Sequence, residues 1–140
     1  MNAQIVKDVA SKLGADLCGI ASIDRFADAP AGFRPTDIYA NCKSVAVFAK
    51  KLPSNPLHLA NCVPYTHVND LITRDIDMLT LSLSLELEKI GISNVLVPSD
   101  DPYEHWEPGK MYGRAILSLR HAGYLAGLGK SGKNTPLIND

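Results

Sequence analysis

The chain has 140 residues, a formal net charge of −1 and 46% hydrophobic residues, values that indicate one globular domain over residues 1–140. Such a nearly neutral chain has no electrostatic reason to bind nucleic acid or an anionic membrane surface non-specifically. No apolar run approaches the ~20 residues of a membrane span, and the N-terminus lacks a signal-peptide pattern. We therefore expect a cytoplasmic protein without a membrane partner.

The first half of the chain predicts one helix and two strands. Residues 2–13 carry apolar side chains at helical spacing and end at Gly14, which predicts an amphipathic helix. Residues 15–22 predict a short strand, and the prolines within residues 23–43 predict a loop or a broken helix. Residues 44–50 are apolar nearly throughout, so we expect them to form a central strand.

The strongest helical pattern in the chain lies in residues 68–90. Its apolar residues recur every three or four positions, and Gly91 ends it. Leu71, Leu81 and Leu85 widen the apolar stripe. We expect the stripe to be buried against the predicted sheet. The repeating positions are Val68, Ile72, Ile76, Leu79, Leu83, Leu87 and Ile90.

The remaining elements complete an α/β pattern. Residues 94–97 predict a third strand, residues 100–109 a polar loop rich in aromatic side chains, and residues 111–126 a third helix. The apolar pair that follows Pro136 predicts the start of another strand. Helices and strands that alternate in this way favour an α/β layered sheet with flanking helices.

The sequence offers no standard metal site. Its cysteines, Cys18, Cys42 and Cys62, are too few and too scattered for a disulfide framework or a four-cysteine site. Iron–sulfur clusters also require closely spaced cysteines. His58, Cys62 and His67 are four and five residues apart, which is no standard zinc spacing and supplies only three ligands. We therefore expect this chain to bind no metal by itself.

Three glycines stand close together near the C-terminus: Gly127, Gly129 and Gly132, followed by Lys133 and Asn134. Their spacing resembles a dinucleotide fingerprint and a phosphate loop, but both of those motifs leave a strand and open a helix. Here the glycines follow a predicted helix, and Asn134 stands where a phosphate loop needs Ser or Thr. Neither motif is predicted. One alternative is a helix stop followed by a tight turn.

The same segment resembles the corrinoid-binding part of epoxyqueuosine reductases, a signature shared with reductive dehalogenases and related ferredoxin-like proteins. The order of elements agrees with this family over all 140 residues. The resemblance is carried by Arg120-His-Ala-Gly123, Leu125-Ala-Gly-Leu-Gly129, Gly132-Lys-Asn-Thr135 and Leu137-Ile-Asn139, and more weakly by Ala15-Asp-Leu-Cys-Gly-Ile-Ala21, Ser44-Val-Ala-Val47 and Tyr65-Thr-His-Val-Asn69.

This resemblance implies a nitroreductase-like α/β fold and a cobalamin-dependent reductase, an oxidoreductase whose substrate stays open. It implies that electrons come from two 4Fe–4S clusters in cysteine-rich sequence downstream of residue 140. We therefore expect a truncated domain, inactive alone, that needs an electron-donor domain or protein. A tRNA partner is implied only for a true epoxyqueuosine reductase. The implied cofactor-binding residues are Tyr65, His67, Gly127, Gly129, Gly132, Lys133 and Asn134.

The chain departs from the family at the proton donor. The family has an aspartate in a Val-Asp-Ser-Ala-Pro segment after the third strand, and Pro98 occupies that position here. Asp100 or Asp101 would replace the aspartate if the loop were shifted. Two carboxylates near His105 could supply a proton donor with a raised pKa. The alternative is a solvated acidic loop with no catalytic role.

Two other functions stay open. The chain would be a non-catalytic module if it only held a corrinoid or another cofactor for a partner. It would be a flavin-binding reductase if a related fold held a flavin in place of cobalamin.

Overall fold

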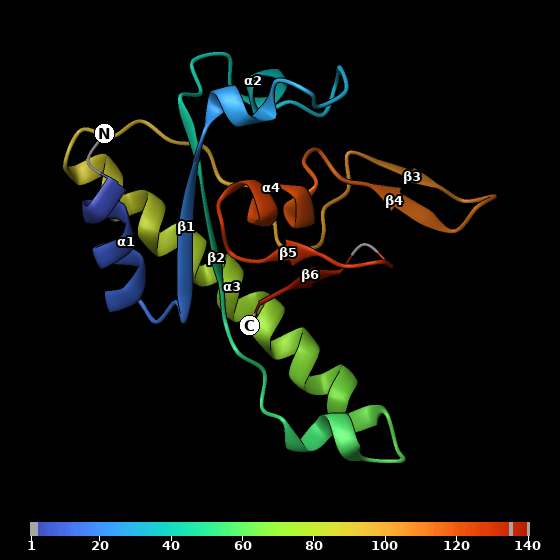
Figure 1. Ribbon diagram of the computed structural model, residues 1–140. Helices are drawn as coiled ribbons and strands as arrows, with labels where there is room; N and C mark the ends of the chain where they lie inside the picture. Colours follow the sequence, from blue (N-terminus) through green and yellow to red (C-terminus); the bar gives the residue numbers. More distant parts are fainter. Residues whose placement is uncertain (1–2, 135, 140) are drawn as a thin grey trace.

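The computed structural model describes residues 3–134 and 136–139. It combines helices with small antiparallel sheets, which is an α/β arrangement at this coarse level (Figure 1). No helix in these two ranges is both long and apolar enough to cross a membrane. The elements are α1 (Ala3–Lys12), β1 (Leu17–Ser22), η1 (Ile23–Phe26), α2 (Pro35–Ile38), β2 (Ser44–Ala49), η2 (Asn55–His58), α3 (Val63–Lys89), β3 (His105–Glu107), β4 (Tyr112–Arg114), α4 (Leu119–Leu125), β5 (Lys130–Ser131) and β6 (Leu137–Ile138).

The antiparallel pair β1–β2 is covered on both of its faces. Its register runs from Leu17 opposite Ala49 to Ser22 opposite Ser44. Successive side chains of a strand point to opposite faces, so β2 contributes to two separate cores. In Figure 1, α1 and α3 lie on one side of this pair and α4 lies on the other. This double coverage is the reason that β2 has no polar face.

The first core joins α1 and α3 to one face of the pair. Val6 and Ala10 of α1 are fully buried against Leu83 and Leu87 of α3. Phe48 of β2 packs against this cluster. Burying one such aliphatic side chain stabilises the fold by about 1.5–3 kcal/mol. The predicted helices over residues 2–13 and 68–90 are therefore confirmed as elements.

The second core lies on the opposite face. Ala21 and Phe26 are buried together with Leu117 and Ala122, and Val47 of β2 packs against them. The approach of α4 to β1 is close. A Cβ on Gly19 would lie 2.4 Å from the carbonyl oxygen of Ala126. A side chain at position 19 would therefore push the end of α4 away from β1.

The helices α1, α3 and α4 end in the same way. At the end of α3, Gly91 has a φ of +80°, its N–H donates to the carbonyl of Glu88, and the N–H of Ile92 donates to the carbonyl of Leu87. This pair of hydrogen bonds is a Schellman motif. Equivalent bonds surround Gly14 after α1 and Gly127 after α4. The predicted stops at Gly14 and Gly91 are confirmed.

The predicted third strand is wrong. Residues 92–98 form no strand in this structure, so β2 lies at an edge instead of in the centre. Two hydrogen bonds that involve side chains explain the difference. The amide of Asn94 donates to the carbonyl of Ser84, and the N–H of Ser99 donates to the carboxylate of Asp77. Both bonds attach the segment to α3 instead of β2.

Two other predictions need correction. The third helix begins at Leu119, because residues 112–114 pair with residues 105–107 as the β3–β4 hairpin. The predicted loop over residues 100–109 therefore contains a strand. The buried apolar stripe of α3 is also narrower than predicted, because Leu71, Leu81 and Leu85 are exposed. Periodicity alone did not reveal that α3 packs on one side only.

Replacing Gly91 with Ala should destabilise the protein by about 1 kcal/mol, because the residue must keep a positive φ that a Cβ disfavours. No atom lies within 4 Å of the added Cβ, so the backbone conformation alone causes the loss. Gly109→Ala is the matched control. That position is equally open but has no positive φ, so the free energy of unfolding should hardly change. Chemical denaturation of both variants measures the difference, and equal stability would contradict the motif.

Candidate functional site

A cavity of about 650 Å³ lies beside the outer edge of β2. Its walls come from β2, the helices α3 and α4, and the extended segment over residues 92–97. Both long walls are apolar, with Val45 and Val47 on one side and Leu96 and Val97 on the other. Pockets for small ligands and cofactors typically measure ~300–1,000 Å³ and are lined mainly by apolar side chains.

Polar residues also line the cavity, among them Tyr39, Asn41 and Lys43 in the segment before β2. Asn94 and Ser99 come from the segment attached to α3, and Arg120 comes from α4. The side chains of Asn94 and Ser99 already hydrogen-bond to α3, so they define the cavity's shape as well as its chemistry. Arg120 belongs to the signature that carries the family resemblance, whereas no sequence pattern pointed to Asn94 or Ser99 as site residues. The only available signal was the apolar character of residues 94–97, which were predicted to fill this space as a strand.

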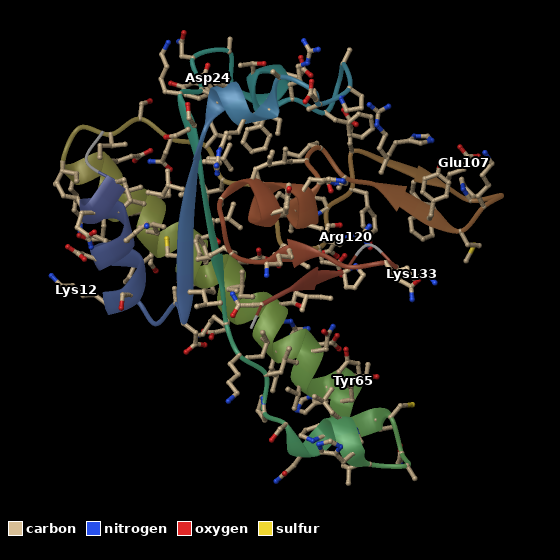
Figure 2. The ribbon with its side chains drawn as sticks, in the orientation of Figure 1. Lys12, Asp24, Tyr65, Glu107, Arg120 and Lys133 are labelled. Carbon is tan, nitrogen blue, oxygen red and sulfur yellow. The ribbon has the colours of Figure 1, made fainter. Side chains whose placement is uncertain are left out.

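The predicted residues Tyr65 and His67 lie elsewhere. Both are exposed in the first turns of α3. Figure 2 shows Tyr65 near the lower end of α3, far from Arg120 beside the cavity. Lys133, at the tip of the β5–β6 hairpin, lies apart from Tyr65. The structure therefore does not bring the helix residues and the glycine turn into one site.

The three predicted glycines have different surroundings. Gly127 has a φ of +78° and open space around it, which is the geometry of a helix stop. A Cβ on Gly129 would lie 2.3 Å from the carbonyl oxygen of Ile138. A Cβ on Gly132 would meet the side chains of Ile138 and Pro136. The glycines at 129 and 132 thus allow β5 to lie close to β6 within the same chain.

Lys133 and Asn134 follow the glycines in an exposed turn between β5 and β6. Neither residue lines the cavity. Other residues of the same C-terminal segment line the cavity, namely Gly123, Leu128 and Leu137. The segment that carries the sequence resemblance therefore borders the cavity, although its glycine turn does not.

The acidic loop precedes and enters the β3–β4 hairpin, which projects from the body (Figure 1). Asp100 and Asp101 are both exposed and do not line the cavity. Tyr103 donates a hydrogen bond to the Asp100 carboxylate at 3.2 Å, and its ring stacks on Trp106 at a centroid distance of 5.5 Å. His105 pairs with Glu107 at 3.5 Å, so it is directed along the hairpin. These contacts order the loop without gathering its carboxylates around one point.

The neighbouring carboxylate changes the acidity of Tyr103. The hydrogen bond to Asp100 and the negative charge of that carboxylate raise the pKa of the Tyr103 hydroxyl, with a smaller contribution from Asp101. The phenol therefore holds its proton more firmly than an isolated tyrosine.

Burial raises the pKa of the Cys18 and Cys42 thiols, so neither is an activated nucleophile. Within the described ranges, no three or more His, Cys, Asp or Glu side chains form a group able to hold a metal ion.

Removing the Asp100 carboxylate should lower the pKa of Tyr103. Because the folded protein favours the protonated phenol, this contribution to stability is present below the ordinary tyrosine pKa and is lost as the pH rises through the raised value. Asp100→Ala should move the phenolate absorbance of Tyr103 to lower pH, and Asp101→Ala should move it less. Subtracting the titration of Tyr103→Phe isolates this residue. Equal shifts for both aspartates would contradict the contact.

Comparisons of this chain with protein-family models, with curated proteins and with solved structures found no match. The resemblance to epoxyqueuosine reductases thus remains a prediction from the sequence.

Proposed function

We propose that this chain is a cofactor-binding module whose ligand lies in the cavity between β2, α3, α4 and residues 92–97. The observation that carries the proposal is the cavity itself, with its volume of about 650 Å³ and its apolar walls. An apolar ring system would pack between Val47 and Val97, and its polar substituents would lie toward Asn94, Ser99 and Arg120.

On the sequence resemblance, we propose that the cofactor is a corrinoid and that the whole protein is a cobalamin- and iron–sulfur-dependent reductase of nitroreductase-like fold. A corrinoid would supply low-potential electron transfer to a substrate. Support comes from the segment containing Gly123 and Leu128, which borders the cavity. A flavin in the same cavity is the alternative, since its flat ring system also suits apolar walls.

The implied contact residues do not form a corrinoid cradle in this structure. Gly129 and Gly132 face β6 and its flanking residues, and Tyr65 lies at the far end of α3. Asp100 and Asp101 remain the proposed proton donors.

Titration with hydroxocobalamin and, separately, with flavin mononucleotide tests the proposal. Absorbance changes that saturate at one ligand per chain are expected for one of the two compounds. Val97→Phe places a larger side chain in the cavity wall and should weaken binding by about tenfold or more, equivalent to 1.4 kcal/mol. The measurement is the Kd of the bound compound for the unmutated chain and for Val97→Phe.

Lys133→Ala separates the two possible sites. If the ligand lies in the cavity, this exposed lysine should leave the Kd unchanged. If the glycine turn holds the cofactor, Lys133→Ala should weaken binding while Val97→Phe has little effect. Thermal unfolding of the free variants controls for damage to the fold. Failure of both compounds to bind the unmutated chain would remove the proposal.

A further inference from the structure

The long helix α3 has a second apolar face that no described part of the chain covers. Leu71, Met78, Leu81 and Leu85 are between 41% and 60% exposed. Leu81 and Leu85 are each two residues away from the buried Leu83, which places them about 200° around the helix from it. The exposed apolar side chains thus lie opposite the face that packs on the protein core.

These exposed residues follow a heptad pattern. Leu71, Met78 and Leu85 are spaced by seven residues, and Leu81 lies three residues after Met78. Alternating spacings of three and four are typical of a helix face that packs along another helix. We call this face the outer stripe. It consists of Leu71, Arg74, Met78, Leu81, Leu85 and Glu88.

The outer stripe is open along its length. On one side, Asp77 and Ser84 of α3 bind the segment over residues 92–99. On the other side, Asp75 pairs with Lys50. Near the C-terminal end of α3, a shallow groove of about 480 Å³ lies beside the stripe. It is lined by Leu13, Ser82, Leu85, Glu86, Glu88 and Lys89.

The first half of α3 is less buried than the second half, although Thr73, Asp75 and Asp77 bond to residues 50 and 99. No residue before Leu79 in this helix is buried. Residues 63–78 would extend roughly 24 Å at 1.5 Å per residue. Figure 1 shows this end of α3 projecting downward from the body. A helical segment of this length is marginal in water without packing, which points to a partner along it.

We propose that the outer stripe pairs with the outer stripe of a second copy of this chain in an antiparallel, two-fold symmetric dimer. Its charges distinguish this pairing from a parallel one. A parallel pair would place Arg74 opposite Arg74 and Glu88 opposite Glu88. An antiparallel pair that aligns Met78 with Leu81 of the other copy places Arg74 one turn from Glu88 of that copy.

The antiparallel pairing also explains the projecting half of α3. Each projecting half would lie along the supported half of the other copy, and symmetry would repeat every contact twice. Leu71 of one copy would reach the level of Glu88 in the other, beside the shallow groove. An apolar side chain at the tip of the stripe would therefore meet an open groove.

Sedimentation velocity of the full chain over a range of concentrations tests the dimer. Met78→Glu and, separately, Leu81→Gln should each raise the dimer Kd by about 30-fold or more, because each change occurs twice in the interface. Met111→Glu is the matched control. Met111 is 74% exposed but lies in the β3–β4 hairpin region, so the dimer should persist. Circular dichroism should show retained helix in all three variants.

Charge reversal tests the orientation. Arg74→Glu and Glu88→Arg should each weaken the dimer, and the double variant should restore its Kd to within about threefold of the original. A chain that stays monomeric at every concentration would overturn the proposal. So would equal dissociation by Met111→Glu. Failure of the double variant to restore the dimer would overturn the antiparallel arrangement.

Discussion

Coverage of the β1–β2 pair on both faces is the constraint on which the rest of this structure depends. Two antiparallel strands alone are marginal in water, so the pair needs helices to bury its side chains. Val6, Leu83 and Leu87 cover one face, and Leu117 and Ala122 cover the other. Since β2 contributes Phe48 to one core and Val47 to the other, loss of this strand would separate the two cores.

The cavity follows from the same arrangement. With only two strands in the sheet, the outer edge of β2 has no neighbouring strand, and residues 92–97 pass at a distance that leaves a space between them. The segment is held away from β2 because Asn94 and Ser99 hydrogen-bond to α3. A ligand in this space would contact both cores through β2 and α4. Binding would therefore stabilise the folded state as a whole, in addition to any chemical role.

The glycines show how one residue type serves separate physical needs. Gly14, Gly91 and Gly127 provide the positive φ of helix ends. Gly19 and Gly129 instead provide room, because a Cβ at either position would meet a backbone carbonyl of a neighbouring element. A sequence pattern cannot separate these two uses, since both leave a glycine beside apolar residues. The cluster near the C-terminus contains both, and so its spacing resembled a ligand-binding motif.

The sequence by itself determined α1, α3 and the first two strands, because their signals are local. Apolar spacing of three and four residues identified α1 and α3, glycines marked their ends, and the apolar run of β2 indicated a strand, which was expected to be central but lies at an edge. Tertiary structure decided which partners these elements have. The strand propensity of residues 94–97 is realised only if β2 pairs with them, and side-chain bonds to α3 hold them elsewhere.

The β3–β4 hairpin was missed because its strands have three residues each, too few for a period-2 pattern. The predicted cofactor-binding residues share a sequence signature, but Tyr65 lies apart from Lys133, since neighbours in a signature become neighbours in space only through long-range packing. The cavity has no sequence motif because its lining comes from β2, α3, α4 and residues 92–97, which are far apart in the sequence.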